Sequence, residues 1–357
     1  MPGRGEGTAI PAALADIGPA VAARIERLLA TETERWVAVD PVMREPFEYL
    51  RELVGAGGKR LRPAFCFWAF VGAGGSPEDP SVVDAGAALE LLHTFALIHD
   101  DVMDGSATRR GMPAVHAKFE RHHEAHRLRG EGRRFGEGVA ILVGDLTFVY
   151  ADQLLAGASA EAWRVFDELR LEVNVGQYLD LVATARADHS RETSSRIARY
   201  KSAKYTVERP LHLGAALASA LPRLQEPLSA FGLPLGDAFQ LRDDLLGAFG
   251  DPDAIGKPVG DDLREGKPTA LISLARERAD RSQLALLDER LGRRDLTEAD
   301  VAEIQAVLIE TGARVEVERE VKVLVEDALA ALRATDLTAE ARERLAELAE
   351  FVAGRDH

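Results

Sequence analysis

Apolar side chains recur every three or four residues along most of this chain, and that spacing constrains the fold more than any other feature. Leu89, Leu92 and Phe95 follow it in one segment, and Leu345 and Leu348 follow it close to the end. Residues spaced in this way lie on one face of an α-helix. Stretches with the alternating pattern of a β-strand, flanked by hairpin dipeptides, are nearly absent. The sequence therefore predicts an all-α protein.

Short stretches rich in Gly and Pro divide the predicted helices. They lie at residues 72–80, 111–113, 221–227 and 250–260. Because Gly and Pro interrupt a regular helix, we expect helix ends at these points. Thr297 followed by Asp300 is typical of the capped start of a helix. Residues 1–18 are also rich in Gly, Pro and Ala, so we expect a flexible N-terminal arm before a single helical domain over residues 19–357.

Composition excludes several classes of protein. The 357 residues include 59 Asp and Glu against 44 Lys and Arg, a net charge of −15, whereas non-specific nucleic-acid binding depends on neutralising phosphates. Cys66 is the single cysteine, which leaves no intrachain disulfide and no cysteine zinc site. The longest apolar stretch, 64–73, is about half the roughly 20 residues that a membrane-spanning helix needs. The N-terminus lacks the apolar run of a signal peptide. We predict a cytoplasmic protein with no membrane span and no nucleic-acid partner.

The segment 121–134 holds five Arg and three His. Such a charge run is typical of a solvated surface loop or a frayed helix end. His122 and His126 could share a helix face and bind a stray metal ion, but no carboxylate is placed to complete that site. We therefore predict a solvated surface segment.

The first of two aspartate clusters lies within residues 91–111, at the end of a predicted apolar helix. On a helix, Asp100 and Asp104 share one stripe with His93, and Asp101 is adjacent. Clustered carboxylates repel one another and lose hydration when they are buried, so they need a cation. Carboxylate oxygens, completed by water and phosphate oxygens, suit Mg²⁺.

The second aspartate cluster comes about 140 residues later, on another apolar helix. Gln240 and Asp244 share a stripe with Asp251, and Asp243 is adjacent. Either cluster alone would also fit a solvated acidic turn. Both together indicate two helix faces that meet across one cavity and hold several Mg²⁺ ions around a single polyanion.

Basic residues accompany both clusters. In the stretch GGKRLRP, Lys59 and Arg62 lie one helical turn apart, after glycines that let the backbone approach a phosphate closely. Arg109 and Arg110 follow the first cluster, and a guanidinium group suits phosphate oxygens. Single lysines also fit an ordinary surface role; those that add positive charge here lie at positions 201, 204, 257 and 267.

Five motifs in this order resemble the trans-isoprenyl diphosphate synthases, the polyprenyl synthetase family. They are GGKRLRP, LLHTFALIHDDVMDGSATRRG, YKSAKYT, FQLRDDLLGAFGD and GKPVGDDLREGKPT, and the resemblance runs from Phe47 to Leu274. It implies a ring of antiparallel helices around a deep central cavity, usually in a homodimer. It also implies head-to-tail condensation of isopentenyl diphosphate with an allylic diphosphate (dimethylallyl, geranyl or farnesyl) by Mg²⁺-assisted ionisation, condensation and elimination.

The resemblance implies a role for each matching residue. Three Mg²⁺ ions, for which Mn²⁺ could substitute, would have as principal ligands Asp100, Asp104 and Asp243, supported by Asp101 and Asp244. The allylic diphosphate would be held by Arg109, Lys201, Gln240 and Lys257, with Ser202 and Lys267 as further substrate-binding residues. Isopentenyl diphosphate would occupy a metal-free anion site made of Lys59, Arg62, His93 and Arg110. Lys201 and Lys257 would join the five aspartates as catalytic residues.

The chain departs from many relatives at Gly247, where they carry a third Asp. Asp251, one turn further on, would compensate in part, so we interpret the glycine as tuning metal affinity. Ser202 stands where the family often has Thr, which keeps the hydroxyl. By resemblance Phe95 forms the floor that limits product length, and its neighbour Ala96 is small. This combination points to geranylgeranyl diphosphate rather than farnesyl or longer products, unless Phe95 is simply a core residue.

Two other functions compete with a synthase. A class I terpene cyclase also ionises an allylic diphosphate at an aspartate-rich helix, but it has no need of a second anion site such as Lys59, Arg62 and His93. A non-catalytic subunit of a heteromeric synthase would tend to lose the aspartate clusters. The sequence favours the synthase over both.

Overall fold

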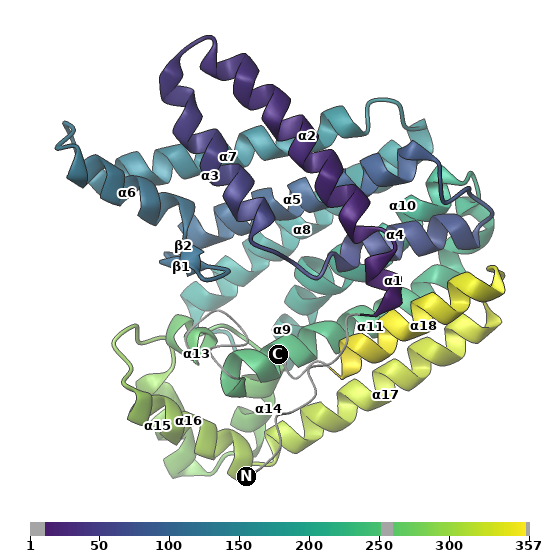
Figure 1. The fold of residues 1–357 in the computed structure, drawn as a ribbon. Helices are drawn as coiled ribbons and strands as arrows, with labels where there is room; N and C mark the ends of the chain where they lie inside the picture. Colours follow the sequence, from purple (N-terminus) through teal and green to yellow (C-terminus); the bar gives the residue numbers. More distant parts are fainter. Residues whose placement is uncertain (1–10, 251–259, 355–357) are drawn as a thin grey trace, which may run out of the picture.

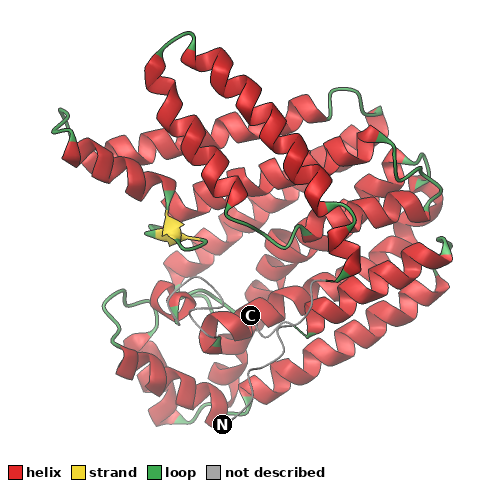
Figure 2. Cartoon of the chain, viewed as in Figure 1, coloured by secondary structure: helices red, strands yellow, loops and turns green. Residues whose placement is uncertain are grey.

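The fold is described here from a computed structural model, which places residues 11–250 and 260–354 (Figure 1). Within these ranges the chain is almost entirely helical, with one short strand pair (Figure 2). The prediction of an all-α protein is confirmed. The elements are α1 (Ala12–Ala15), α2 (Gly18–Val37), η1 (Pro41–Met43), α3 (Arg44–Gly55), α4 (Leu61–Gly72), α5 (Pro80–Asp104), β1 (Thr108–Arg109), β2 (Met112–Pro113), α6 (Val115–Ala125), α7 (Gly132–Leu154), α8 (Ala160–Arg186), α9 (Arg191–Ile197), η2 (Ala198–Glu208), α10 (Arg209–Leu217), α11 (Leu221–Phe249), α13 (Asp261–Glu265), α14 (Ala270–Arg278), α15 (Arg281–Arg290), α16 (Glu298–Glu310), α17 (Ala313–Ala334) and α18 (Ala339–Ala353).

Helix α5 runs through the middle of the molecule and carries the first aspartate cluster at its end (Figure 1). The side chain of Asp79 caps its start by accepting a hydrogen bond from the backbone N–H of Ser81 at 2.9 Å. Gly105 ends it with a φ of 67°, a left-handed conformation that glycine adopts without strain. By length and hydropathy α5 could cross a membrane, but 61% of its most apolar window is buried inside the protein. It is therefore accounted for as a core helix.

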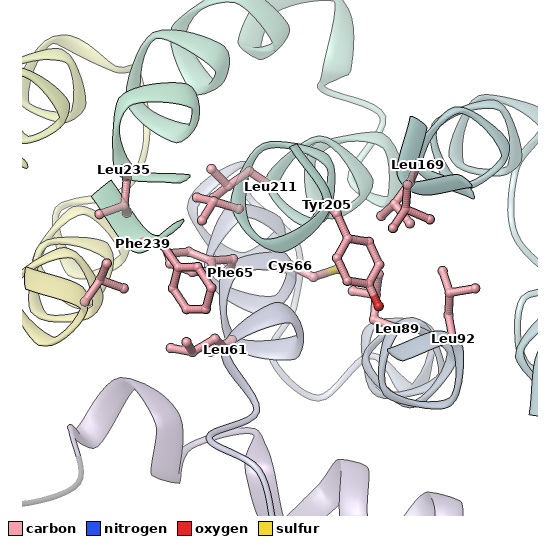
Figure 3. Packing of buried hydrophobic residues seen from close by; sticks show 14 of the residues in the cluster. Leu61, Phe65, Cys66, Leu89, Leu92, Leu169, Tyr205, Leu211, Leu235 and Phe239 are labelled. Atoms are coloured by element: carbon pink, nitrogen blue, oxygen red, sulfur yellow. The ribbon is translucent and has the colours of Figure 1, made fainter. Parts of the chain in front are cut away.

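The core around α5 explains why the helices assemble. Helix α4 packs between α5 and α10, and its Phe65 and Cys66 are fully buried together with Leu89 on α5 (Figure 3). Tyr205 and Phe239 approach the same cluster from η2 and α11. Full burial of such a side chain contributes about 1.5–3 kcal/mol. This packing fixes the positions of the C-terminal ends of α5 and α11 relative to each other.

Element η2 is a π-helix held between two glycines. A Cβ atom on Gly176 of α8 would lie 2.4 Å from the backbone nitrogen of Lys201, and one on Gly236 of α11 would lie 2.5 Å from the Cα atom of Ala203. Both distances are far below van der Waals contact, so only glycine allows α8 and α11 to approach η2 this closely. π-helical turns are frequent at functional sites, and this one carries Lys201.

The described part of the expected N-terminal arm is packed rather than loose. Residues 11–18 include α1, whose Ala13 is fully buried and whose Leu14 is 5% exposed. The indole N–H of Trp68 donates to the carbonyl of Ala13 at 3.0 Å. Apolar burial and this hydrogen bond explain the difference from the expectation of flexibility over this part.

The break predicted at 72–80 is confirmed, because α4 ends at Gly72 and α5 begins at Pro80. The break predicted at 221–227 lies earlier, at 218–220, and most of 250–260 lies outside the described residues. Thr297 and Asp300 form the expected reciprocal cap of α16, whereas α11 starts at Leu221 and continues through Pro227. A proline inside a helix costs about 3 kcal/mol, and the full burial of Leu228 and Phe231 immediately after it offsets that cost.

The segment 121–134 forms the end of α6 and the connection to α7, and most of it is exposed, as predicted. The imidazole of His122 pairs with Glu45 at 2.9 Å and stacks on His126 at 4.1 Å between ring centroids. His123 is the exception to exposure, because it is buried with a ring nitrogen 3.1 Å from the carbonyl oxygen of Arg129.

Candidate diphosphate and metal site

Both aspartate clusters open onto one cavity of about 480 Å³. Its walls come from the end of α5, the β1–β2 hairpin, α8, η2, α11 and α13. The ionisable and amide side chains that line it are Lys59, Asp100, Arg109, Asp180, Lys201, Gln240, Asp243, Asp244, Asp261, Asp262 and Lys267. The expectation that the two clusters face a common cavity is therefore met.

Asp100 stands among cations. Its carboxylate accepts from Lys201 Nζ at 3.2 Å and from the amide of Gln177 at 2.9 Å, and Arg109 Nη2 lies 3.8 Å away. Burial alone would raise its pKa, but Lys201, Lys267 and Arg109 hold the pKa of Asp100 below its usual range. The carboxylate is therefore ionised and compensated before any ligand arrives.

The other two aspartates of the first cluster are paired with different cations. Asp101 is buried and accepts from Arg109 Nε at 2.9 Å. Asp104 lies 3.0 Å from Lys267 Nζ, which also lies 2.6 Å from Glu265. Lys267 thus joins the end of α5 to the segment after α13.

Asp244 in the second cluster has neutral donors. Its carboxyl accepts from the Gln240 amide at 2.7 Å and from the backbone N–H of Ala270 at 3.3 Å. Burial, with a further contribution from the negative charges of Asp262 and Asp243, raises the pKa of Asp244 to about 7. The charge of Asp244 is therefore less compensated than that of Asp100.

Two buried or half-buried residues that the sequence reasoning missed hold the first cluster in place. Asp180 on α8 accepts from Lys201 Nζ at 2.7 Å, and Gln177, one turn before it, donates to Asp100. Neither lies in a recognisable motif. The only sequence signal was a polar pair one turn apart on an otherwise apolar helix face.

The residues expected to form the metal-free anion site lie together beside this cavity. Lys59 lines the cavity itself. Arg62 stacks on the Tyr205 ring at 4.3 Å, and the Tyr205 hydroxyl lies 3.3 Å from His93 Nδ1. Burial and the nearby charges of Arg62 and Arg110 lower the pKa of His93 well below its usual value. The positive potential here suits an anion.

The remaining expected residues are placed as follows. Ser202 is half-buried on η2, next to Lys201. Lys257 and Asp251 lie outside the described residues, so the expectation that Asp251 compensates for Gly247 stays a prediction. Phe95 and Ala96 are half-buried on α5, and the Phe95 ring lies 4.9 Å from that of Phe148 on α7.

The cavity fits a hard divalent cation. Its acidic donors are all carboxylates, which Mg²⁺ prefers. A Cβ atom on Gly247 would lie 2.1 Å from Asp262 Oδ2, so the glycine opens a space that a carboxylate fills. Among the described residues, no three His, Cys, Asp or Glu side chains converge closely enough to hold a metal ion by themselves.

Fold and site together define a helical enzyme for a polyanionic substrate. The family model for polyprenyl synthetase matches residues 41–308. A geranylfarnesyl diphosphate synthase from Aeropyrum pernix is 31% identical over 315 residues, covering 85% of this chain and 92% of that protein. A geranylgeranyl diphosphate synthase from Methanosarcina mazei is 36% identical over 247 residues, covering 67% and 70%.

A solved structure agrees with these relatives. Geranylgeranyl pyrophosphate synthase from Corynebacterium glutamicum, complexed with isoprenyl diphosphate and magnesium, matches with a TM-score of 0.90 and 39% identity, over 94% of this chain and 97% of that chain. The chain belongs to the polyprenyl synthetase family, and it is a trans-prenyltransferase.

Proposed function

We propose that this enzyme condenses isopentenyl diphosphate with an allylic diphosphate and releases geranylgeranyl diphosphate. The observation that carries the proposal is the meeting of two aspartate clusters with Lys59, Arg109, Lys201 and Lys267 around one cavity. The names of the relatives from M. mazei and C. glutamicum support the product, while the A. pernix relative is named for a product one isoprene unit longer.

Metal would be held by the aspartates of both clusters. Asp100, Asp104 and Asp243 would be the principal ligands, and Asp244 would support them. When bound, Mg²⁺ would take up negative charge on the diphosphate leaving group. Asp101 would act through Arg109, whose guanidinium it holds in position.

Basic side chains would bind the two diphosphates. Arg109 and Lys201 now pair with carboxylates at the cavity wall, and they would turn part of their hydrogen-bonding capacity to the allylic diphosphate, with Gln240 and Lys257, and with Ser202 and Lys267. Isopentenyl diphosphate would lie among Lys59, Arg62, His93 and Arg110. An anion there would relieve the repulsion among these cations.

Departure of diphosphate leaves an allylic carbocation, which the isopentenyl double bond attacks to form one carbon–carbon bond. Loss of one proton then forms the new double bond. We propose that the departing diphosphate accepts this proton, because Asp100 is ion-paired and acidic whereas Lys201 stays protonated. The apolar core beside α5 keeps water away from the cation.

Phe95 would limit the length of the growing chain. It lies five residues before Asp100, which is about 7.5 Å along a helix at roughly 1.5 Å per residue. Its ring packs against that of Phe148 of α7, with the ring centroids 4.9 Å apart, so two aromatic rings would limit the chain together.

The enzyme would work as a cytoplasmic homodimer. Helices α7 and α8 carry exposed apolar side chains, including Leu142 at 65%, Val149 at 49%, Leu171 at 63% and Tyr178 at 68%. We propose that these exposed apolar side chains belong to the dimer interface, since interaction surfaces are rich in such residues. Light scattering should give twice the mass of one chain; the mass of a single chain would overturn this proposal.

The test is a Mg²⁺-dependent assay with isopentenyl diphosphate and dimethylallyl, geranyl or farnesyl diphosphate, with products sized by mass spectrometry. We expect a linear C20 diphosphate that is lost in EDTA. Phe95→Ala should lengthen the product, and Phe135→Ala, at an exposed ring of α7, is the matched control. Cyclic hydrocarbons from a single allylic diphosphate would indicate a cyclase, and absence of turnover would indicate a non-catalytic subunit.

A further inference from the structure

The ring of Phe148 on α7 contacts a largely buried arginine as well as Phe95. Phe95 and Phe148 are half-buried, and their ring centroids lie 4.9 Å apart. The guanidinium carbon of Arg170 on α8 lies 4.9 Å from the centroid of the Phe148 ring, within the distance at which a cation is attracted to an aromatic face. Phe148 is therefore in contact with a ring from α5 and a cation from α8.

Rings and carboxylates from two helices fix the position of Arg170. Its guanidinium carbon also lies 4.8 Å from the ring centroid of Phe166 and 5.8 Å from that of Trp163. Its Nη1 donates to Asp152 of α7 at 2.6 Å, and its Nη2 donates to Asp167 of α8. A planar guanidinium group can stack on rings with its faces while its N–H groups point to carboxylates, so several contacts restrain this side chain together.

These contacts tie α7 to α8 close to the Phe148 ring. Asp152 lies one helical turn after Phe148 on α7, and Phe166 on α8 is fully buried. A movement of the Phe148 ring away from Phe95 would therefore require Arg170 to leave the other rings or Phe148 to lose its contact with the cation. Either change costs favourable interaction energy.

We propose that Arg170 is a positioning residue for product length, which holds the Phe148 ring against Phe95 so that the end of the prenyl-chain space is braced from α8. The inference rests on the proposed function, because it concerns the floor under the growing chain. Loss of the Phe95 ring then leaves a second, fixed ring in place. Loss of Arg170 as well frees that second ring to move.

The sizes of the products formed from isopentenyl and farnesyl diphosphates test this. Phe95→Ala should lengthen the main product by one isoprene unit, because Phe148 still blocks the space. Phe95→Ala/Arg170→Met should lengthen it by at least one unit more, because Met keeps an unbranched side chain but neither pairs with Asp152 nor attracts the ring by its charge. Arg170→Met alone should shift only a minor fraction of the product to longer chains, because the Phe95 ring remains.

A second arginine of α8 provides the matched control. Arg164 is exposed and pairs with Glu161 at 3.5 Å, so Arg164→Met should leave product length unchanged, alone and together with Phe95→Ala. Arg170→Met should still fold, because Asp152 and Asp167 are partly exposed and stay hydrated without their partner. Thermal melting followed by circular dichroism checks this. If Arg170→Met does not fold, Phe95→Ala/Asp152→Asn decides instead, and it should lengthen the product beyond that of Phe95→Ala.

The outcomes separate this inference from the reaction itself. The same product length from Phe95→Ala and from the folded double variant would overturn the role of Arg170 and leave the synthase reaction standing. Failure of the wild-type protein to elongate any allylic diphosphate would overturn the proposed function as well.

Discussion

Asp100 at the end of α5 is surrounded by Lys201, Arg109 and Lys267, whereas the hydrogen bonds to Asp244 on α11 come from an amide and a backbone N–H. The first cluster therefore has its charge balanced by cations from three different elements before a ligand binds. The hydrogen-bond donors of Asp244 are both neutral, and burial with neighbouring carboxylates raises its pKa to about 7. The comparison teaches that aspartates of two similar sequence motifs can have opposite electrostatic surroundings, which lower the pKa of Asp100 and raise that of Asp244.

The largest difference between substitutions in the two clusters should be in the rate of turnover. Asp100→Ala removes a proposed metal ligand and one counter-charge of Lys201 and Arg109. We therefore expect kcat/KM to fall about 10²- to 10³-fold, as when a preorganised electrostatic group is lost. Asp244→Asn keeps a hydrogen-bonding side chain and should cost about tenfold, as for a supporting ligand.

Steady-state kinetics with isopentenyl and farnesyl diphosphates would measure both losses, with Asp327→Ala as an exposed control. Equal losses in Asp100→Ala and Asp244→Asn would mean that the two clusters contribute alike, contrary to the comparison.

The effect on the free energy of unfolding should be smaller than the effect on turnover. Without metal, Asp100→Asn removes one of several counter-charges of these partly buried cations. We expect a loss of about 2 kcal/mol in the free energy of unfolding, less than the 3–5 kcal/mol typical of a fully buried pair. Urea denaturation in EDTA would measure it. A gain in stability would show that the three cations do not need Asp100.

The contribution of Asp244 to the pH dependence of folding stability should have the opposite sign to that of Asp100, because the pKa of Asp244 is raised and that of Asp100 is lowered. The pKa of Asp244 is about 7 in the fold and near 3.8 in the unfolded chain, so between these values the folded state binds the extra proton and wild-type stability falls as pH rises. From pH 6 to pH 8 that loss should amount to about 1 kcal/mol.

Asp244→Asn removes this titration. In EDTA the variant should match the wild type near pH 6 and exceed it at pH 8. Parallel pH profiles for the two proteins would show that Asp244 ionises normally.

Much of this site could be predicted from the sequence because its parts are local. The stripe that joins His93, Asp100 and Asp104 needs only the geometry of one helix, and α5 has that geometry. The start of α16 at Thr297 follows equally from a four-residue pattern.

The rest depends on residues that are distant in the chain. Nothing near Lys201 indicates that Asp180 is its partner, because the two lie on different helices. The meeting of Gly247 and Asp262 depends on how α13 docks on α11. Pro227 misled the prediction for the same reason, since the burial that sustains α11 through it is tertiary.

The glycines that flank η2 have a consequence for how this enzyme tolerates mutation. Gly176 packs on the backbone of Lys201 and Gly236 on that of Ala203, and neither contact leaves room for a methyl group. In a saturation-mutagenesis map both positions should therefore be as intolerant as catalytic residues, although neither carries a functional group. The placement of Lys201 thus depends on two positions that carry no side chain. A screen that selects for activity would find glycine invariant at both.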